Sequence, residues 1–308
     1  MSFKENLIEK MKERGLADSS IKTYIRNLEK LNNDEPLKNL NFLKKKEHVT
    51  DFLKDKMPNT QRNYYIAITS AFSSLGIENK LYNYYYDMMM TYNKDLKKIE
   101  SEQKKSESQK ENWIDFDEVE KIQKNLESQV DEFKNKKSIN EKQYDILLKY
   151  MILSLYTLLP PRRNKDFLEC NVIKKYNDEL ENTKNYLDLN KQEFRFNQFK
   201  TAKSEGSQII KIPDDLMKVI TIYLKFHPNY SKDKNLNIPF LVYFNGKPLD
   251  KVNSITLILN KIFGKKIGSS MLRHIYLTSK YGDIQKEMQE DAKIMSHSVG
   301  QQAEYIKK

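Results

Sequence analysis

An arginine, two histidines and a tyrosine lie close together near the C-terminus of this 308-residue chain, and their side chains can act on a phosphodiester. They are Arg273, His274, His297 and Tyr305, in a sequence that contains only four histidines. A guanidinium binds phosphate oxygens through paired N–H donors, an imidazole donates or accepts a proton, and a phenol can attack phosphorus. The segment therefore indicates phosphoryl transfer, although each residue taken singly also has an ordinary structural interpretation.

The spacing of these residues is more informative than their types. Leu272-Arg273-His274, followed by Ser296-His297-Ser298 and then by Tyr305, resembles the C-terminal half of the signature of the tyrosine recombinases, the phage integrase-like family. The resemblance implies that Arg273 and His297 bind the scissile phosphate and that Tyr305 is the nucleophile. It also implies a 3′-phosphotyrosyl intermediate, which forms without a metal ion or other cofactor.

An earlier segment supplies a second arginine. The apolar run from Glu141 to Leu159 predicts a buried helix, and two prolines end it directly before Arg162 and Arg163. The pattern resembles the first box of the family, in which an acidic residue follows the catalytic arginine by three positions. This match implies that Arg163 is catalytic and that Asp166 orients neighbouring groups. Arg162 is then a flanking phosphate contact or a salt-bridge residue; the alternative register, in which Arg162 is catalytic, puts a lysine at the acidic position.

Alternation of apolar and polar residues predicts strands at 186–189, 193–199 and 208–212, joined by short polar connections into a small antiparallel sheet. Lys200 lies where the second strand enters its turn. The family carries a catalytic lysine in such a hairpin, often as Lys-Thr, and the resemblance implies that Lys200 protonates the leaving 5′ oxygen. Lys203 is the competing assignment.

One position departs from the family pattern. Three residues before the second arginine the family usually has His, but this chain has Ser270. The general base for Tyr305 therefore stays open between His274, which is often a supporting residue in the family, and Ser270 with a water. The nearest rival nucleophile, Tyr281, lies eight residues beyond Arg273, about 12 Å along one helix. That distance is too long for both to contact one phosphate.

The composition favours an acidic polymer as partner. The formal net charge is +11, from 54 Lys and Arg against 43 Asp and Glu, although a Lys-rich composition also arises from an A/T-rich genome. The single cysteine, Cys170, excludes an intramolecular disulfide and a cysteine-based zinc cluster. The N-terminus has no signal-peptide pattern, and the most apolar run, 150–159, is too short to cross a membrane. We expect a soluble, intracellular protein without a membrane segment.

Residues 3–90 predict several short helices with one packing face and one basic face. The residues Ile21, Ile25, Leu28 and Leu31 form an apolar stripe, and the candidate DNA-binding residues are Lys22, Arg26 and Lys30 on another face, with Arg62 in a second helix after Pro58. Such a region is similar to the SAM-like helical core-binding domain of the recombinases, which clamps double-stranded DNA opposite the catalytic domain.

These observations predict a mainly α protein with a small antiparallel sheet. The expected parts are an N-terminal DNA-binding domain over 1–93, a polar linker over 94–112 and a recombinase catalytic domain over 113–308. The resemblance implies a site-specific recombinase or integrase of a mobile element or large DNA virus, acting as a homo-tetramer on synapsed DNA. Because only three residues follow Tyr305, we expect a surface other than a C-terminal helix to join the subunits. The alternatives are a type IB topoisomerase or telomere resolvase, and a DNA-binding relative that has lost activity.

Overall fold

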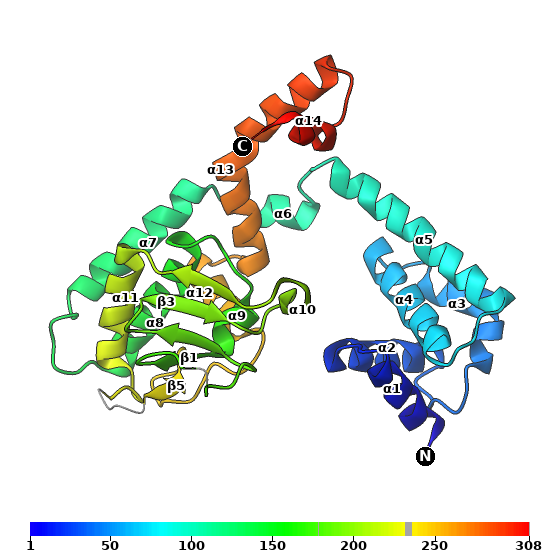
Figure 1. The fold of residues 1–308 in the computed structure, drawn as a ribbon, viewed down its shortest axis with the longest axis horizontal. Coiled ribbons are helices and arrows are strands. Elements are labelled where there is room, and N and C mark those ends of the chain that lie inside the picture. Colours follow the sequence, from blue (N-terminus) through cyan, green and yellow to red (C-terminus); the bar gives the residue numbers. More distant parts are fainter. Residues whose placement is uncertain (178, 232–235, 308) are drawn as a thin grey trace. The chain divides into compact units, whose positions relative to one another are not determined.

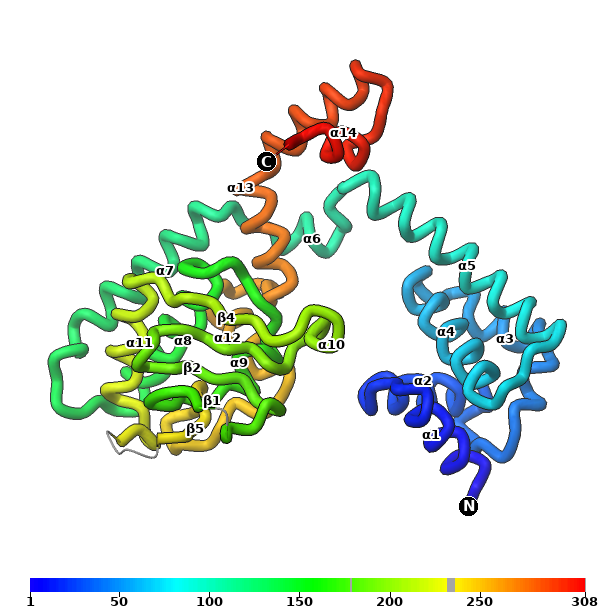
Figure 2. Tube along the Cα trace, viewed as in Figure 1, coloured from blue at the N-terminus to red at the C-terminus, as the bar shows by residue number. Residues whose placement is uncertain are grey.

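The computed structural model describes residues 1–177, 179–231 and 236–307, and it divides into two compact units, Met1–Lys105 and Ser106–Lys308 (Figure 1, Figure 2). The boundary between the units falls inside the segment expected to be a linker. Much of that segment is helical, because α5 (Lys80–Ser101) continues into it and α6 (Glu107–Asn112) follows. Ser106 caps α6 through a reciprocal hydrogen-bonded pair with Gln109.

Unit 1 is helical. Besides α5, it contains α1 (Phe3–Glu13), α2 (Asp18–Leu31), the 3-10 helix η1 (Asn41–Lys44), α3 (Lys46–Leu53) and α4 (Pro58–Ser74). The four residues of the apolar stripe on α2 are buried, as predicted, and they pack against α4. Proline at the start of α4 suits a first helical turn, whose backbone N–H groups have no intrahelical acceptor. The opposite face of α2 is left to solvent.

Unit 2 packs helices around a small sheet. Its helices are α7 (Phe116–Asp131), α8 (Glu141–Thr157), α9 (Asn164–Leu168), α10 (Ala202–Glu205), α11 (Asp214–Phe226), α12 (Ser254–Phe263), α13 (Ser269–Ile294) and α14 (Val299–Tyr305). The apolar helix α8 is the centre of the core, because α7, α11 and α12 all pack against it. It ends just before the two prolines, as predicted. The chain therefore reaches the arginine pair directly from a rigid, buried element.

The sheet has five strands in the order β4-β3-β2-β1-β5. They are β1 (Cys170–Ile173), β2 (Asn185–Asp188), β3 (Glu193–Phe196), β4 (Gln208–Lys211) and β5 (Asn237–Pro239). The expectation of a purely antiparallel sheet is wrong in one pairing, because β1 runs parallel to β2, from Cys170 opposite Asn185 to Ile173 opposite Asp188. A parallel neighbour needs a crossover connection rather than a hairpin. The chain makes this crossover between Ile173 and Asn185, and no alternating sequence pattern predicts β1.

Both histidines outside the motifs have structural surroundings. In unit 1, Nε2 of His48 lies 3.1 Å from the carbonyl oxygen of Leu31. In unit 2, His227 is buried, its Nε2 lies 3.1 Å from the carbonyl oxygen of Pro239, and its Nδ1 accepts a 3.1 Å hydrogen bond from the backbone N–H of Asn229. An accepting Nδ1 identifies the neutral ring that carries its proton on Nε2. Burial lowers the pKa of His227.

Over the described parts of the chain, none of the helices is both long enough and apolar enough to cross a membrane.

Candidate active site

Arg163 and Arg273 come from different elements and approach each other. Arg163 is the exposed residue that precedes α9, and Arg273 lies in the second turn of α13, where it is partly buried. Burial lowers the pKa of Arg273, and the positive charge of Arg163 lowers it further, so the two guanidiniums lie within electrostatic range. The Nε atom of Arg273 is buried and has no hydrogen-bond partner within the described residues. Two converging cations with an unused donor form a site suited to an anion.

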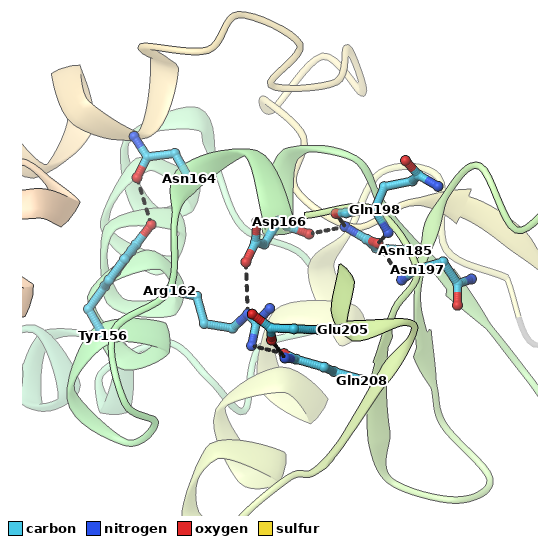
Figure 3. A network of polar contacts seen from close by, with 9 residues as sticks. All are labelled: Tyr156, Arg162, Asn164, Asp166, Asn185, Asn197, Gln198, Glu205 and Gln208. Carbon is cyan, nitrogen blue, oxygen red and sulfur yellow. Dashed lines mark hydrogen bonds and ion pairs between the residues drawn. The ribbon is translucent and has the colours of Figure 1, made fainter. Parts of the chain in front are cut away.

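Asp166 is buried beside these arginines, with 3% of its surface exposed. The Nε–H group of Arg162 donates to its Oδ2 at 2.8 Å, within an ion pair whose arginine side chain is only 16% exposed (Figure 3). Burial raises the pKa of Asp166, while the charges of Arg162, Arg163 and Arg273 oppose that rise. Of the two roles that the sequence leaves open for Arg162, these contacts favour the salt bridge over a phosphate contact.

A chain of polar contacts fixes α9 against the start of α13. The hydroxyl of Tyr156, at the end of α8, donates to Oδ1 of Asn164 at 2.8 Å (Figure 3). Nδ2 of Asn164 in turn donates to the hydroxyl of Thr256 at 2.8 Å. Thr256 also lies against Gly268, which caps α13, so closely that a Cβ there would come within 3.2 Å of the threonine methyl group. Burial raises the pKa of Tyr156, so its hydroxyl stays a neutral donor. These contacts hold α9, which follows Arg163, in a fixed position relative to α13, which carries Arg273.

The connection from β3 to β4 carries both candidate lysines. Lys200 and Lys203 are exposed, and neither has an ion pair or side-chain hydrogen bond with another described residue. The fully buried Asn185 holds the beginning of this connection, because its Nδ2 donates to the carbonyl oxygens of Asp166 and Gln198, both at 2.9 Å. Its Oδ1 accepts from the backbone N–H of Gln198 at 2.8 Å. Asn185 therefore joins the arginine turn, residues 162–166, to a point two residues before Lys200.

His297 and Tyr305 form a separate group beyond the other end of α13. Their rings lie 5.8 Å apart between centroids, at an angle of 47°. Tyr305 is 71% exposed, while Nε2 of His297 is buried and lacks a partner within the described residues. The helix carries the chain about 30 Å from Arg273 to its end at Ile294, and α14 returns only about 10 Å (Figure 1). In this conformation Tyr305 therefore does not lie beside Arg273, with which the resemblance groups it at one phosphate.

The two candidates for general base lie on the arginine side of this division. Ser270 and His274 are exposed on α13, and they are spaced three and one residues from Arg273. Residues three and four apart share one face of a helix, so Ser270 faces the same side as both Arg273 and His274. The structure thus separates the predicted residues into an arginine group and a tyrosine group. Among the described residues, no three His, Cys, Asp or Glu side chains are arranged to hold a metal ion.

The candidate DNA-binding residues of unit 1 differ in whether their side chains already have a partner. Lys22 and Arg26 are exposed on α2, whereas the ammonium of Lys30 pairs with Asp34 at 3.0 Å. Arg62 donates to the side chain of Asn93. Burial raises the pKa of Tyr64 on α4 and the charges of Lys30 and Arg26 oppose that rise, so these two residues lie within electrostatic range of Tyr64. Lys22 and Arg26 form the exposed basic edge of unit 1.

Sequence reasoning missed the residues that position the arginines: Tyr156, Asn164, Asn185, Gln208 and Thr256. Their partners are up to 92 positions away along the chain, and no local spacing marks them. The one available signal was a side chain with a polar group inside an otherwise apolar segment, as for Tyr156 in the apolar run of α8. Such residues must find hydrogen-bond partners once buried.

No protein-family model and no curated protein matches the sequence. Among solved structures, the chain is similar to the one described as the crystal structure of XerA recombinase, with 13% sequence identity, coverage of 90% of this chain and 82% of that chain, and a TM-score of 0.34. A likeness at this TM-score does not place a single active-site residue.

Proposed function

We propose that this protein is a tyrosine-type site-specific DNA recombinase, or integrase, that cleaves and rejoins DNA strands. The observation that carries the proposal is the pair of arginines around Asp166, with the unused Nε donor of Arg273. Like charges held side by side raise the free energy of the folded protein unless an anion binds between them, and a phosphodiester matches their paired donors. The net charge of +11 and the basic edge of unit 1 favour double-stranded DNA as the source of that phosphate.

The reaction exchanges one phosphodiester for another. The phenolic oxygen of Tyr305 attacks phosphorus and its proton goes to the general base, which is His274 or Ser270 with a water. The bond to the 5′ oxygen breaks, and Lys200 gives a proton to that leaving oxygen. Arg163, Arg273 and His297 stabilise the charge on the non-bridging oxygens; each such donor typically contributes a factor of roughly 10² to 10³ in rate. Attack by another 5′-hydroxyl on the 3′-phosphotyrosine reseals the strand and frees Tyr305. Exchange between two duplexes breaks four strands, which fits four copies with one nucleophile each.

This mechanism requires Tyr305 to reach the arginines, and α13 contains a position where the helix can bend. Gly282 lies in its middle, and glycine destabilises a helix interior by about 1 kcal/mol relative to alanine. Around it, Leu277, Tyr281 and Ile284 are half exposed along one stripe. Burying such side chains contributes roughly 1 kcal/mol each, and breaking a helical turn loses about four hydrogen bonds of roughly 1 kcal/mol. The straight and bent forms are therefore close in free energy.

The test is covalent trapping on a nicked DNA substrate that loses its short 5′ leaving strand after cleavage. We expect the wild-type protein to become covalently linked to DNA, and Tyr305→Phe to bind the same DNA with unchanged affinity and form no adduct. Tyr281→Phe is the matched control, because it removes the same oxygen from α13, and it should trap DNA normally.

Adduct formation by the Tyr305→Phe variant, with the phosphate mapped to another residue, would show that the nucleophile is misassigned. Failure of the wild-type protein to trap DNA that it binds would instead favour the inactive DNA-binding relative. Relaxation of supercoiled DNA without pairing of two sites would favour the topoisomerase.

A further inference from the structure

Arg162 contacts two separate parts of the catalytic unit at once. Its Nε–H group donates to Asp166 on α9 at 2.8 Å, and its Nη1 donates to Oε1 of Gln208 on β4 at 3.0 Å (Figure 3). The guanidinium carbon also lies 4.0 Å from the ring centroid of Phe196 and 5.5 Å from that of Phe199. One side chain therefore joins the arginine turn to both ends of the β3–β4 connection.

That connection has little packing of its own. Within 197–207, residues 203–207 are exposed, α10 is a single four-residue turn, and Gly206 adopts a left-handed conformation with φ of 71°. Gln208 extends the contact by donating to Glu205 at 2.8 Å. Lys200 follows Phe199 directly, so the contacts of Arg162 lie one residue before the lysine and at the end of the loop that carries it. Asn185 fixes the connection as far as Gln198, and the contacts of Arg162 with Phe199 and Gln208 then lie on either side of Lys200.

We infer that Arg162 is a positioning residue that sets the place of the Lys200 ammonium relative to Arg163. The inference rests on the proposed function and deepens it, because it gives Arg162 a task distinct from binding phosphate. The task needs the planar guanidinium, which directs two donors to two acceptors while its face lies on an aromatic ring. A lysine keeps the positive charge beside Asp166 but cannot donate in both directions with the same geometry.

The experiment compares two DNA substrates that differ in one atom, the 5′-bridging oxygen or a sulfur in its place. A thiol has a pKa near 8.5, far below that of an alcohol, so a thiolate leaves without a proton whereas an alkoxide needs one. Sulfur therefore removes the need for a general acid. We measure Lys200→Ala and Lys203→Ala on both substrates, and the variant that sulfur rescues identifies the general acid. Arg163→Ala is the control variant that sulfur should not rescue.

For Arg162→Lys, we expect cleavage of the oxygen substrate at saturating DNA to fall by roughly 10-fold to 100-fold, since a misplacement near 1 Å costs about that much. The sulfur substrate should restore cleavage to within about threefold of wild type, with DNA affinity unchanged. Gln208→Leu removes only the β4 half of the contact and should give a smaller loss with the same rescue. It keeps the test informative if Arg162→Lys fails to fold.

Three results would overturn the inference. A loss of cleavage that sulfur does not rescue would assign Arg162 to general stability or to phosphate stabilisation. A parallel loss of DNA affinity would make it a phosphate contact. Rescue of Lys203→Ala in place of Lys200→Ala would move the acid to α10 and end the assignment of Lys200. Each of these presupposes a wild-type protein that cleaves, so an inactive wild type refutes the proposed function instead.

Discussion

Gly282→Ala should slow DNA cleavage if α13 must bend for Tyr305 to reach the arginines. A Cβ at this position meets only the methyl group of Thr278, at 3.7 Å, so alanine fits the straight helix without strain. Alanine favours a helix interior over glycine by about 1 kcal/mol. A shift of that size lowers the equilibrium constant for bending about fivefold, and single-turnover cleavage at saturating DNA should fall by up to that factor.

The assay follows covalent adduct formation over time with the nicked substrate, and DNA affinity is measured beside it. Gln285→Ala is the matched control, because it lies three residues further along the same exposed helix and changes helix propensity by only a few tenths of a kcal/mol. Gly282→Pro acts in the opposite sense, since proline disfavours the straight helix by about 3 kcal/mol. It should retain cleavage where alanine reduces it.

An unchanged cleavage rate in Gly282→Ala, with Gly282→Pro inactive, would refute bending at this position. Tyr305 would then have to reach the arginines of a second copy. Mixing Arg273→Ala with Tyr305→Phe distinguishes the two arrangements. A bent helix within one chain predicts no adduct from the mixture, because neither variant holds a complete site, whereas exchange between copies predicts that activity returns.

Three further predictions concern charge. Arg163→Ala and Arg273→Ala should each reduce adduct formation by roughly 10² to 10³ while duplex affinity stays within a few-fold, and equal losses of both would make these arginines general anchors. The logarithm of DNA affinity should fall linearly with that of salt concentration, and Lys22→Ala should lessen the slope by about one, unlike Lys4→Ala, whose ammonium already pairs with Glu29 at 2.7 Å. Burial lowers the pKa of His227, so the folded state resists its protonation. The free energy of unfolding should therefore stay constant above about pH 6.5 and fall below it, by at most about 1.4 kcal/mol per pH unit. In urea titrations followed by the fluorescence of the single tryptophan, Trp113, the His227→Gln variant should lack this pH-dependent component. The same pH dependence in both proteins would exclude His227 as its source.

The predictable parts of the fold are those with a local physical signal. Strands expected at 186–189, 193–199 and 208–212 appear as β2, β3 and β4, because alternating side chains and a turn with Gly206 mark them. The helix before the proline pair ends where proline must end it. The short strand β1 has no such signal, and its parallel partner follows only from a crossover that no residue type announces. Pairing between strands is a property of the whole unit.

The candidate site likewise has parts that the sequence predicts and parts that it does not. The pattern of charges directs attention to the residues of the arginine turn, but it leaves two roles open for Arg162. The contacts that favour one role come from Phe196 and Gln208, the latter 46 positions away. A guanidinium can satisfy a carboxylate, an amide and a ring face together, and only the folded arrangement determines which of these lie within reach.

Tyr305 illustrates a further limit, because the spacing of motifs along the sequence does not fix the distance between them in space when a long helix lies between them. The straight α13 carries the chain about 30 Å from Arg273 to Ile294 before α14 returns toward it, whereas a bent helix would bring Tyr305 much nearer to Arg273. Under the proposed function, DNA supplies what the free protein lacks: a phosphate that pairs with the two arginines and gives the buried Nε of Arg273 an acceptor. Arg163 and Arg273 both precede Gly282, so a phosphate bound to them contacts the straight and bent forms of α13 alike. The bent form gains the further hydrogen bond that His297 then donates to the same phosphate, and a hydrogen bond to a charged group contributes about 1.5–3 kcal/mol. Binding of the phosphate that is to be cut thereby stabilises the arrangement that cuts it.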